Sequence, residues 1–150
     1  MKKISILIFL AVIGFTASAQ WTYKTINSEF DGKFKKAYVK SGNYAYLGME
    51  QGDNVPMIYL NGSYFCDDEA IIEIVLHVNG KTIKYDIDAI KSSDNRSYYI
   101  SDNIWTEEFI QNFKLATKCN IRVTQDHCST DYYSFNMSGS TAAFNFIMNK

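Results

Sequence analysis

Proline is almost missing from this chain of 150 residues, which contains a single one. The chain also has no internal repeat, no low-complexity tract and no linker-like segment after residue 20. These absences argue against a disordered linker and favour one folded domain that can bury a sizeable core. Eleven tyrosines and ten phenylalanines are present, and aromatic residues at this frequency are typical of a β-rich fold.

An excess of positive charge is missing as well. The chain has 15 basic and 16 acidic residues, and its formal net charge is −1. Residues 1–19 hold two of the basic residues and no acidic residue, so the remaining chain carries a net charge of −3. Nucleic-acid-binding domains normally show a basic footprint, so this balance argues against a nucleic-acid partner.

The first nineteen residues have the three parts of a secretory signal peptide. Lys2 and Lys3 are followed by an apolar run over residues 4–15, and Ala17-Ser18-Ala19 offers small residues before Gln20. The run of twelve residues is too short for a membrane-spanning helix, which needs about 20. The sequence therefore predicts a cleaved signal over residues 1–19, with a retained membrane anchor as the alternative, and a single β-rich domain over residues 20–150.

Features that would hold the exported product at a membrane are lacking. The first cysteine is Cys66, far from the position that a lipidated N-terminus requires. The longest later apolar stretch, residues 70–78, is interrupted by Glu73 and His77. We therefore expect a periplasmic or extracellular protein with no membrane span after cleavage.

Cysteine is scarce, with three residues that outside the cytoplasm tend to be oxidised. An odd number permits at most one internal disulfide and leaves one thiol. Cys119 and Cys128 are the candidate pair, because they bracket a predicted strand and turn. A disulfide formed by Cys66 is the competing possibility, and the sequence leaves the choice open.

Most of the chain shows the alternation of β-strands, and one hairpin gives the strongest signal. Apolar residues alternate on both sides of Asn79-Gly80, the dipeptide best suited to a type I′ turn, which predicts a hairpin over residues 69–88. Further strands are predicted over residues 21–26, 34–40, 44–50, 56–61, 97–101, 120–124 and 133–137.

Two segments near the C-terminus change to helical spacing. Residues 106–118 carry apolar side chains at this spacing, and acidic residues occupy the first turn. A final helix ends at Asn149, with Ser140 or Thr141 as its cap. We predict a mainly β fold, an antiparallel β-sandwich or rolled sheet with two packed helices near the C-terminus. A more evenly mixed α+β fold is the alternative.

Residues that would form a catalytic or metal centre are sparse. His77 and His127 are the only histidines, and no glycine-flanked serine forms a nucleophile elbow. Cys66 precedes three acidic residues, which raise the pKa of a thiol and oppose its reactivity. Adjacent His127 and Cys128 lack the C-x-x-C spacing of zinc sites, and the acidic runs lack the calcium-loop pattern. We therefore name no catalytic, metal or cofactor-binding residue.

Tyrosines are the remaining candidates for binding residues, and many occur in near-adjacent pairs. Neighbouring residues in a strand point to opposite faces, so some of these side chains are expected on the surface. Ordinary cross-strand packing is the competing interpretation. A contact surface for a protein or a glycan could contain Tyr44, Tyr46, Tyr98, Tyr99 and Tyr132.

The C-terminal half combines Trp105, a helix with Phe109 and Ala116, the strand Ile121-Arg122-Val123, and the segment Tyr133–Ser140 before a closing helix. In these features it resembles small periplasmic accessory proteins of bacterial secretion systems, notably those of type VI secretion. Phe30-Asp31-Gly32-Lys33 is also similar, whereas the cysteine that those proteins often carry near the C-terminus is absent. The resemblance implies an accessory role and no catalytic residues.

These observations favour a secreted or periplasmic, non-enzymatic binding or accessory domain. Its partner would be another secreted or envelope protein. A small secreted hydrolase that uses His77 or His127 is one alternative, and it requires a nucleophile or carboxylate within hydrogen-bond reach of a histidine. A glycan-binding module is the other alternative, and it requires a line of coplanar exposed aromatic rings.

Overall fold

A computed structural model describes residues 21–29, 32–42, 44–52, 56–62, 65–93, 96–100 and 106–149. The predicted signal over residues 1–19 lies outside the described residues. Within them the chain forms two helices and nine strands: β1 (Thr22–Ser28), β2 (Gly32–Ser41), β3 (Ala45–Glu50), β4 (Met57–Asn61), β5 (Glu69–Val78), β6 (Lys81–Lys91), β7 (Ser97–Ile100), α1 (Glu107–Leu115), β8 (Lys118–Thr124), β9 (Asp131–Asn136) and α2 (Ser140–Met148).

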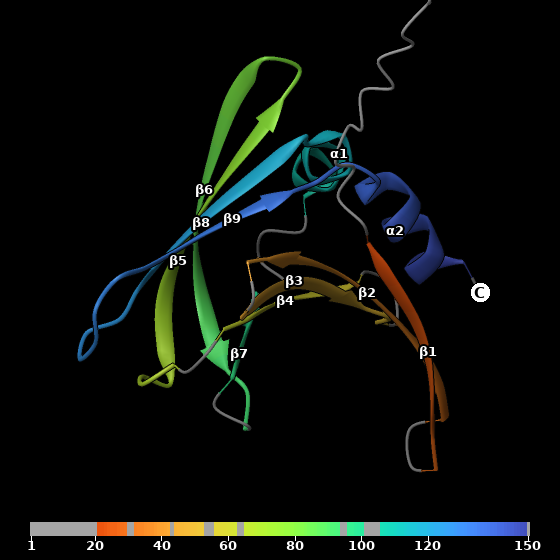
Figure 1. The fold of residues 1–150 in the computed structure, drawn as a ribbon, viewed down its shortest axis with the longest axis horizontal. Coiled ribbons are helices and arrows are strands. Elements are labelled where there is room, and N and C mark those ends of the chain that lie inside the picture. Colours follow the sequence, from red (N-terminus) through yellow and green to blue (C-terminus); the bar gives the residue numbers. More distant parts are fainter. Residues whose placement is uncertain are drawn as a thin grey trace, which may run out of the picture.

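The strands form one open antiparallel sheet in the order β1-β2-β3-β4-β7-β6-β5-β8-β9. The sheet bends between one arm of β1–β4 and a second arm of β5, β6, β8 and β9, and the helices lie between the arms (Figure 1). The bend brings β9 against β2, where the Ser134 amide donates a hydrogen bond of 3.3 Å to Ser41 Oγ. The predicted mainly β fold with two C-terminal helices is confirmed, in its rolled-sheet form.

The hairpin of β5 and β6 is confirmed and supplies much of the core. Ile72, Ile74 and Leu76 alternate along β5 and are almost completely buried. Asn79 and Gly80 form the turn with φ values of 49° and 76°, which glycine and asparagine tolerate best. Each buried Ile or Leu side chain contributes about 1.5–3 kcal/mol relative to an exposed one. The hairpin is therefore held by one apolar face, and its other face remains available to solvent.

The helices cover the inner face of the sheet. Thr106 caps α1 by accepting a 3.1 Å hydrogen bond from the Phe109 amide, and Phe109 and Phe113 are buried against the strands. Neither described helix is long and apolar enough to cross a membrane. Figure 1 shows the opposite face of β1–β4 turned away from both helices, so this face carries no helical cover in the described structure.

The predicted caps of α2 are wrong. Gly139, with a φ of 92°, is the N-cap residue, and no side chain caps this end. The hydroxyls of Ser140 and Thr141 instead both donate hydrogen bonds of 2.8 Å to the Lys114 carbonyl oxygen at the end of α1. These hydroxyls therefore join the two helices, because the close approach of α1 offers them an acceptor that the sequence alone does not reveal.

The candidate disulfide between Cys119 and Cys128 is also corrected. The structure pairs Cys66 with Cys128, with 6.4 Å between their Cα atoms, and leaves Cys119 as a buried free cysteine. Cys119 shares the inner side of β8 with Ile121 and Val123, whereas Cys128 follows the strand in a surface turn. Burial raises the pKa of the Cys119 thiol, so this group stays protonated.

Loss of this disulfide is expected to destabilise the fold. The two cysteines are 62 residues apart, and the chain-entropy relation gives about 4 kcal/mol for a loop of this size. Urea unfolding with and without a reducing agent measures the change. A Cys119→Ala variant serves as the control and should keep the full sensitivity to reductant. Insensitivity of that variant would contradict the Cys66–Cys128 pairing.

Candidate functional site: a tyrosine face on the sheet

A row of tyrosines crosses the helix-free face of the first arm. The register places Tyr38 of β2 opposite Gly48 of β3, Gly48 opposite Tyr59 of β4, and Tyr59 opposite Tyr99 of β7. Residues opposite one another in a sheet point to the same face, so the three phenol side chains share one surface. The inner neighbours on these strands, such as Leu47 and Leu60, are buried in the core.

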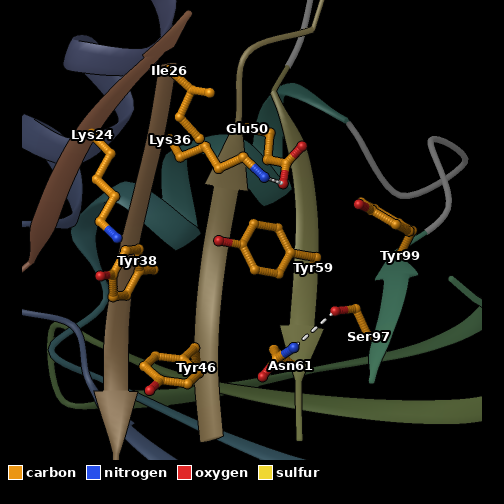
Figure 2. Close-up of a pocket in the computed structure, with 10 residues that line it drawn as sticks. All are labelled: Lys24, Ile26, Lys36, Tyr38, Tyr46, Glu50, Tyr59, Asn61, Ser97 and Tyr99. Carbon is orange, nitrogen blue, oxygen red and sulfur yellow. Dashed lines mark hydrogen bonds and ion pairs between the residues drawn. The ribbon is translucent and has the colours of Figure 1, made fainter. Parts of the chain in front are cut away.

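Gly48 creates a recess in this row. A Cβ atom at this position would lie 2.2 Å from Cζ of Tyr59, which is far inside van der Waals contact. The Tyr59 ring therefore lies directly over the backbone of β3, where a side chain would displace it (Figure 2). An aromatic ring over a strand glycine is a known device for covering exposed backbone.

The Tyr59 ring, which fills this recess, also lines an open hollow of about 460 Å³, within the range of ligand-binding clefts. We call this hollow the tyrosine groove. The side chains around it, drawn in Figure 2, come from β1, β2, β3, β4 and β7. It is lined by Lys24, Ile26, Lys36, Tyr38, Tyr46, Glu50, Tyr59, Asn61, Ser97 and Tyr99.

Charged groups surround the phenols at one end of the tyrosine groove. Lys36 forms an ion pair with Glu50, which is 9% exposed, and the Lys24 Nζ lies 5.5 Å from the centroid of the Tyr38 ring. Burial raises the pKa of Tyr59, and the nearby Glu50 carboxylate raises it further. Tyr59 therefore keeps its proton at neutral pH, and it can donate a hydrogen bond to a ligand.

The predicted contact tyrosines divide between different environments. Tyr46 and Tyr99 line the tyrosine groove, whereas Tyr44 and Tyr132 are 75% and 72% exposed and lie outside it. Tyr98 is a correction, because its side chain points inward and is fully buried. Its hydroxyl oxygen lies 2.7 Å from the carbonyl oxygen of Asp67, which satisfies the buried phenol.

Two tyrosines of the groove, Tyr38 and Tyr59, are absent from the sequence-based set. Each stands alone in its strand, so selection by adjacent pairs overlooks both of them. The alternation within β2 and β4 could have placed each on the outer face. Whether the two side chains lie close together depends on the register between strands, which cannot be predicted from the sequence of one strand.

The aromatic rings do not form the flat platform that the glycan alternative requires. The planes of Tyr38 and Tyr46 are inclined by 84°, and those of Tyr59 and Tyr99 by 57°. Their centroids are 5.4 and 6.2 Å apart, which is typical of edge-to-face and tilted packing. The groove therefore offers ring edges and hydroxyls as well as ring faces.

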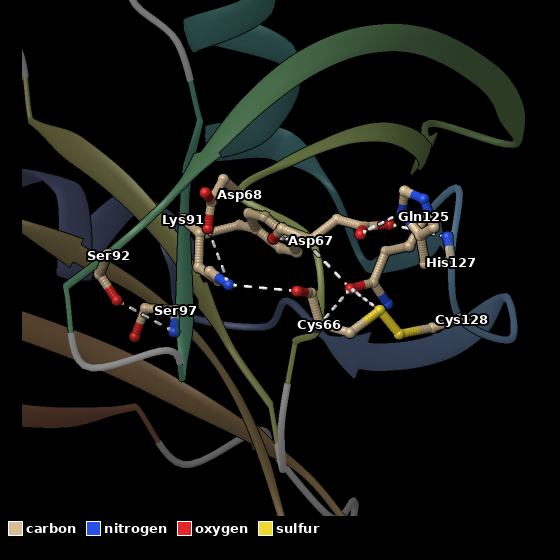
Figure 3. Close-up of polar contacts among 10 residues, drawn as sticks. Cys66, Asp67, Asp68, Lys91, Ser92, Ser97, Gln125, His127 and Cys128 are labelled. Atoms are coloured by element: carbon tan, nitrogen blue, oxygen red, sulfur yellow. Dashed lines mark hydrogen bonds and ion pairs between the residues drawn. A yellow bond between two sulfur atoms is a disulfide. The ribbon is translucent and has the colours of Figure 1, made fainter.

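His127 lies away from the tyrosine groove, beside the disulfide. Its Nδ1 is 2.8 Å from Oδ1 of Asp67, and its amide donates a 3.0 Å hydrogen bond to Oδ2 (Figure 3). The Asp67 carboxylate raises the pKa of His127 through this hydrogen bond and its charge, while the His127 amide lowers the pKa of Asp67. The adjacent Cys128 is bonded to Cys66 and is therefore not a nucleophile.

Other groups around the disulfide are used for structure. The buried Gln125 Oε1 accepts a 2.9 Å hydrogen bond from the Cys66 amide, and Lys91 donates a 3.3 Å bond to the Cys66 carbonyl (Figure 3). His77, on β5, contacts the Asn120 side-chain amide at 3.1 Å. No group of three or more metal-ligating side chains occurs in the described part of the chain. The Asp67 carboxylate lies within hydrogen-bond reach of His127, as the hydrolase alternative requires. These contacts give neither histidine a described serine or free thiol to activate.

Comparisons with protein-family models, with curated proteins and with solved structures give no match to this chain.

The contact between His127 and Asp67 predicts a pH dependence. Asp67→Asn should lower the pKa of His127, as measured by NMR titration of its ring, because the charged acceptor is lost. The stability that the imidazolium contributes is present below the unfolded-state pKa and is lost as pH rises through the raised folded-state pKa. The stability that the Asp67 carboxylate contributes is present above its unfolded-state pKa and is lost as pH falls through its lowered folded-state pKa.

The Asp67→Asn variant should therefore lose most stability between these two pKa values, where both groups are charged. Asp68→Asn is a matched control, because this exposed neighbour contacts Lys91 instead. An unchanged His127 titration in Asp67→Asn would contradict the assignment.

Proposed function

We propose that this chain is an exported, non-enzymatic binding domain that recognises another secreted or envelope protein through the tyrosine groove. The observation that carries the proposal is the row of Tyr38, Tyr59 and Tyr99 on a face without helical cover, with the Tyr59 ring over Gly48. Tyrosines are enriched in protein interfaces because each offers a large rigid surface and one hydroxyl.

The composition of the groove favours binding over catalysis. Its titratable groups are phenols, lysines and one carboxylate that is already paired with Lys36. Both histidines have their described ring contacts elsewhere, with Asp67 and Asn120. A hydrolase needs a nucleophile and a base that converge on one point, and the groove supplies no such pair among the described residues.

Substitution of Gly48 tests the proposal with little disturbance of the fold. Gly48→Ala should displace the Tyr59 ring, because the new Cβ and the ring cannot occupy the same space. The displaced atoms belong to the end of a side chain, so we expect the melting temperature to change by no more than about 5 °C. Binding of the partner should fall by about tenfold or more, because the recess is lost.

The measurement is quantitative capture of secreted and envelope proteins on the immobilised chain, followed by affinity determination for each retained protein. Tyr38→Ala should lower the affinity for the same partner. Tyr132→Ala serves as a matched control, because Tyr132 is an exposed tyrosine outside the groove. The proposal fails if every captured protein binds Gly48→Ala and Tyr38→Ala as tightly as the unmodified chain.

Export is a separate part of the proposal and has its own test. Expression of the full chain in a bacterium with a C-terminal tag should yield a product that begins at Gln20, as measured by mass spectrometry. Ala19→Arg should block this cleavage, because the peptidase requires a small residue there, whereas Ser18→Gln at the tolerant middle position should not. A product that keeps Met1 in the unmodified chain would refute cleavage.

A further inference from the structure

Positive charge is concentrated on the two strands at one edge of the sheet. β1 and β2 contain five lysines and no acidic residue, although the whole chain has a net charge of −1. Strand alternation directs three of them, Lys24, Lys36 and Lys40, to the face of the tyrosine groove. This face is therefore a local basic patch on a mildly acidic protein.

Two of these three lysines lack an acidic partner among the described residues. Lys36 is neutralised by Glu50. Lys24 lies over the Tyr38 ring and Lys40 over the Tyr46 ring, at 5.5 and 5.4 Å from the ring centroids. Lysines placed over aromatic faces have their positions defined but their charges unsatisfied, so they can attract an anion.

The spacing of Lys24 and Lys40 sets a length for the anion. Lys24 is opposite Lys36 in the register, and Lys36 is four residues before Lys40 on β2. The Cα atoms of Lys24 and Lys40 are therefore offset by about 14 Å along the strands, at about 3.4 Å per residue. Tyr38 lies midway between them on the same face.

We propose that the ligand of the tyrosine groove is an extended peptide segment with acidic side chains four residues apart and an apolar side chain midway. In an extended chain, residues i, i+2 and i+4 point to one side, and the outer two are separated by about 14 Å. The two carboxylates then reach Lys24 and Lys40, while the middle side chain packs on Tyr38. This inference rests on the proposed function and names the chemistry of the partner.

A peptide fits the groove better than an acidic glycan does. Sugar rings stack on flat aromatic faces, whereas the rings of the groove are inclined to one another by 84° and 57°. Tyrosine edges and hydroxyls suit the alternating amides and side chains of a peptide. The Tyr59 phenol stays protonated and can donate to a peptide carbonyl.

The test uses a fluorescent capped peptide, Gly-Glu-Ala-Phe-Ala-Glu-Gly, and a peptide of the same composition with adjacent glutamates. Fluorescence anisotropy with the full chain should show at least about tenfold tighter binding of the spaced peptide, because only it reaches both lysines. Its affinity should fall as salt is raised, since exposed charges are screened.

Charge reversal identifies the lysines that act. Lys24→Glu and Lys40→Glu should each lower the affinity for the spaced peptide by about tenfold, because the attraction between lysine and glutamate becomes a repulsion between two carboxylates. Lys33→Glu is the matched control, since this exposed lysine lies on β2 and points to the other face. All variants should keep the melting temperature of the unmodified chain within about 3 °C.

Four other results would each overturn the inference. Equal affinity for the two peptides, or equal weakening by Lys33→Glu, would show that only overall charge matters. Tighter binding of polygalacturonate, with the same dependence on Lys24 and Lys40, would assign the groove to an acidic glycan. A captured protein that needs Tyr38 but neither lysine would leave the proposed function standing and refute the acidic peptide.

Discussion

Burial of one face of a single long sheet is the constraint on which the structure depends. Each strand offers an apolar side and a polar side, and nine strands in one open sheet expose too much apolar surface to remain flat. The sheet bends until β9 reaches β2, and the two helices fill the space between its arms. The polar side is consequently turned outward over its whole width, and the tyrosine groove lies on that side.

Local sequence patterns predicted most of the elements because their signals are contained within single segments. Residues 69–88 alternate around a turn that asparagine and glycine favour, so the hairpin is readable without any knowledge of its neighbours. The helix around Phe109 and Phe113 is readable for the same reason, although it ends at Leu115, earlier than residue 118. The choice between a sandwich and a rolled sheet depends on how distant strands meet, and periodicity carries no such information.

The site was less accessible to sequence reasoning, because it depends on pairing between strands. Tyr46 and Tyr99 were identified, but Tyr98 faces the core, and Tyr38 and Tyr59 were overlooked. The recess requires Gly48 to stand opposite Tyr59, which is a property of the register. The disulfide has the same origin, since the antiparallel pairing of β5 with β8 brings the segment before β5 to the turn after β8.

The Cys66–Cys128 bond determines what a single proteolytic cut does to the chain. It closes a covalent ring that contains β5, β6, β7, α1 and β8, whereas the four strands of the first arm and the last strand and helix lie outside the ring. A protease that cuts once within the ring produces a nicked molecule whose two pieces remain joined. A cut outside the ring releases a fragment. The strands that carry most of the tyrosine groove therefore lack the covalent protection that the central hairpin has.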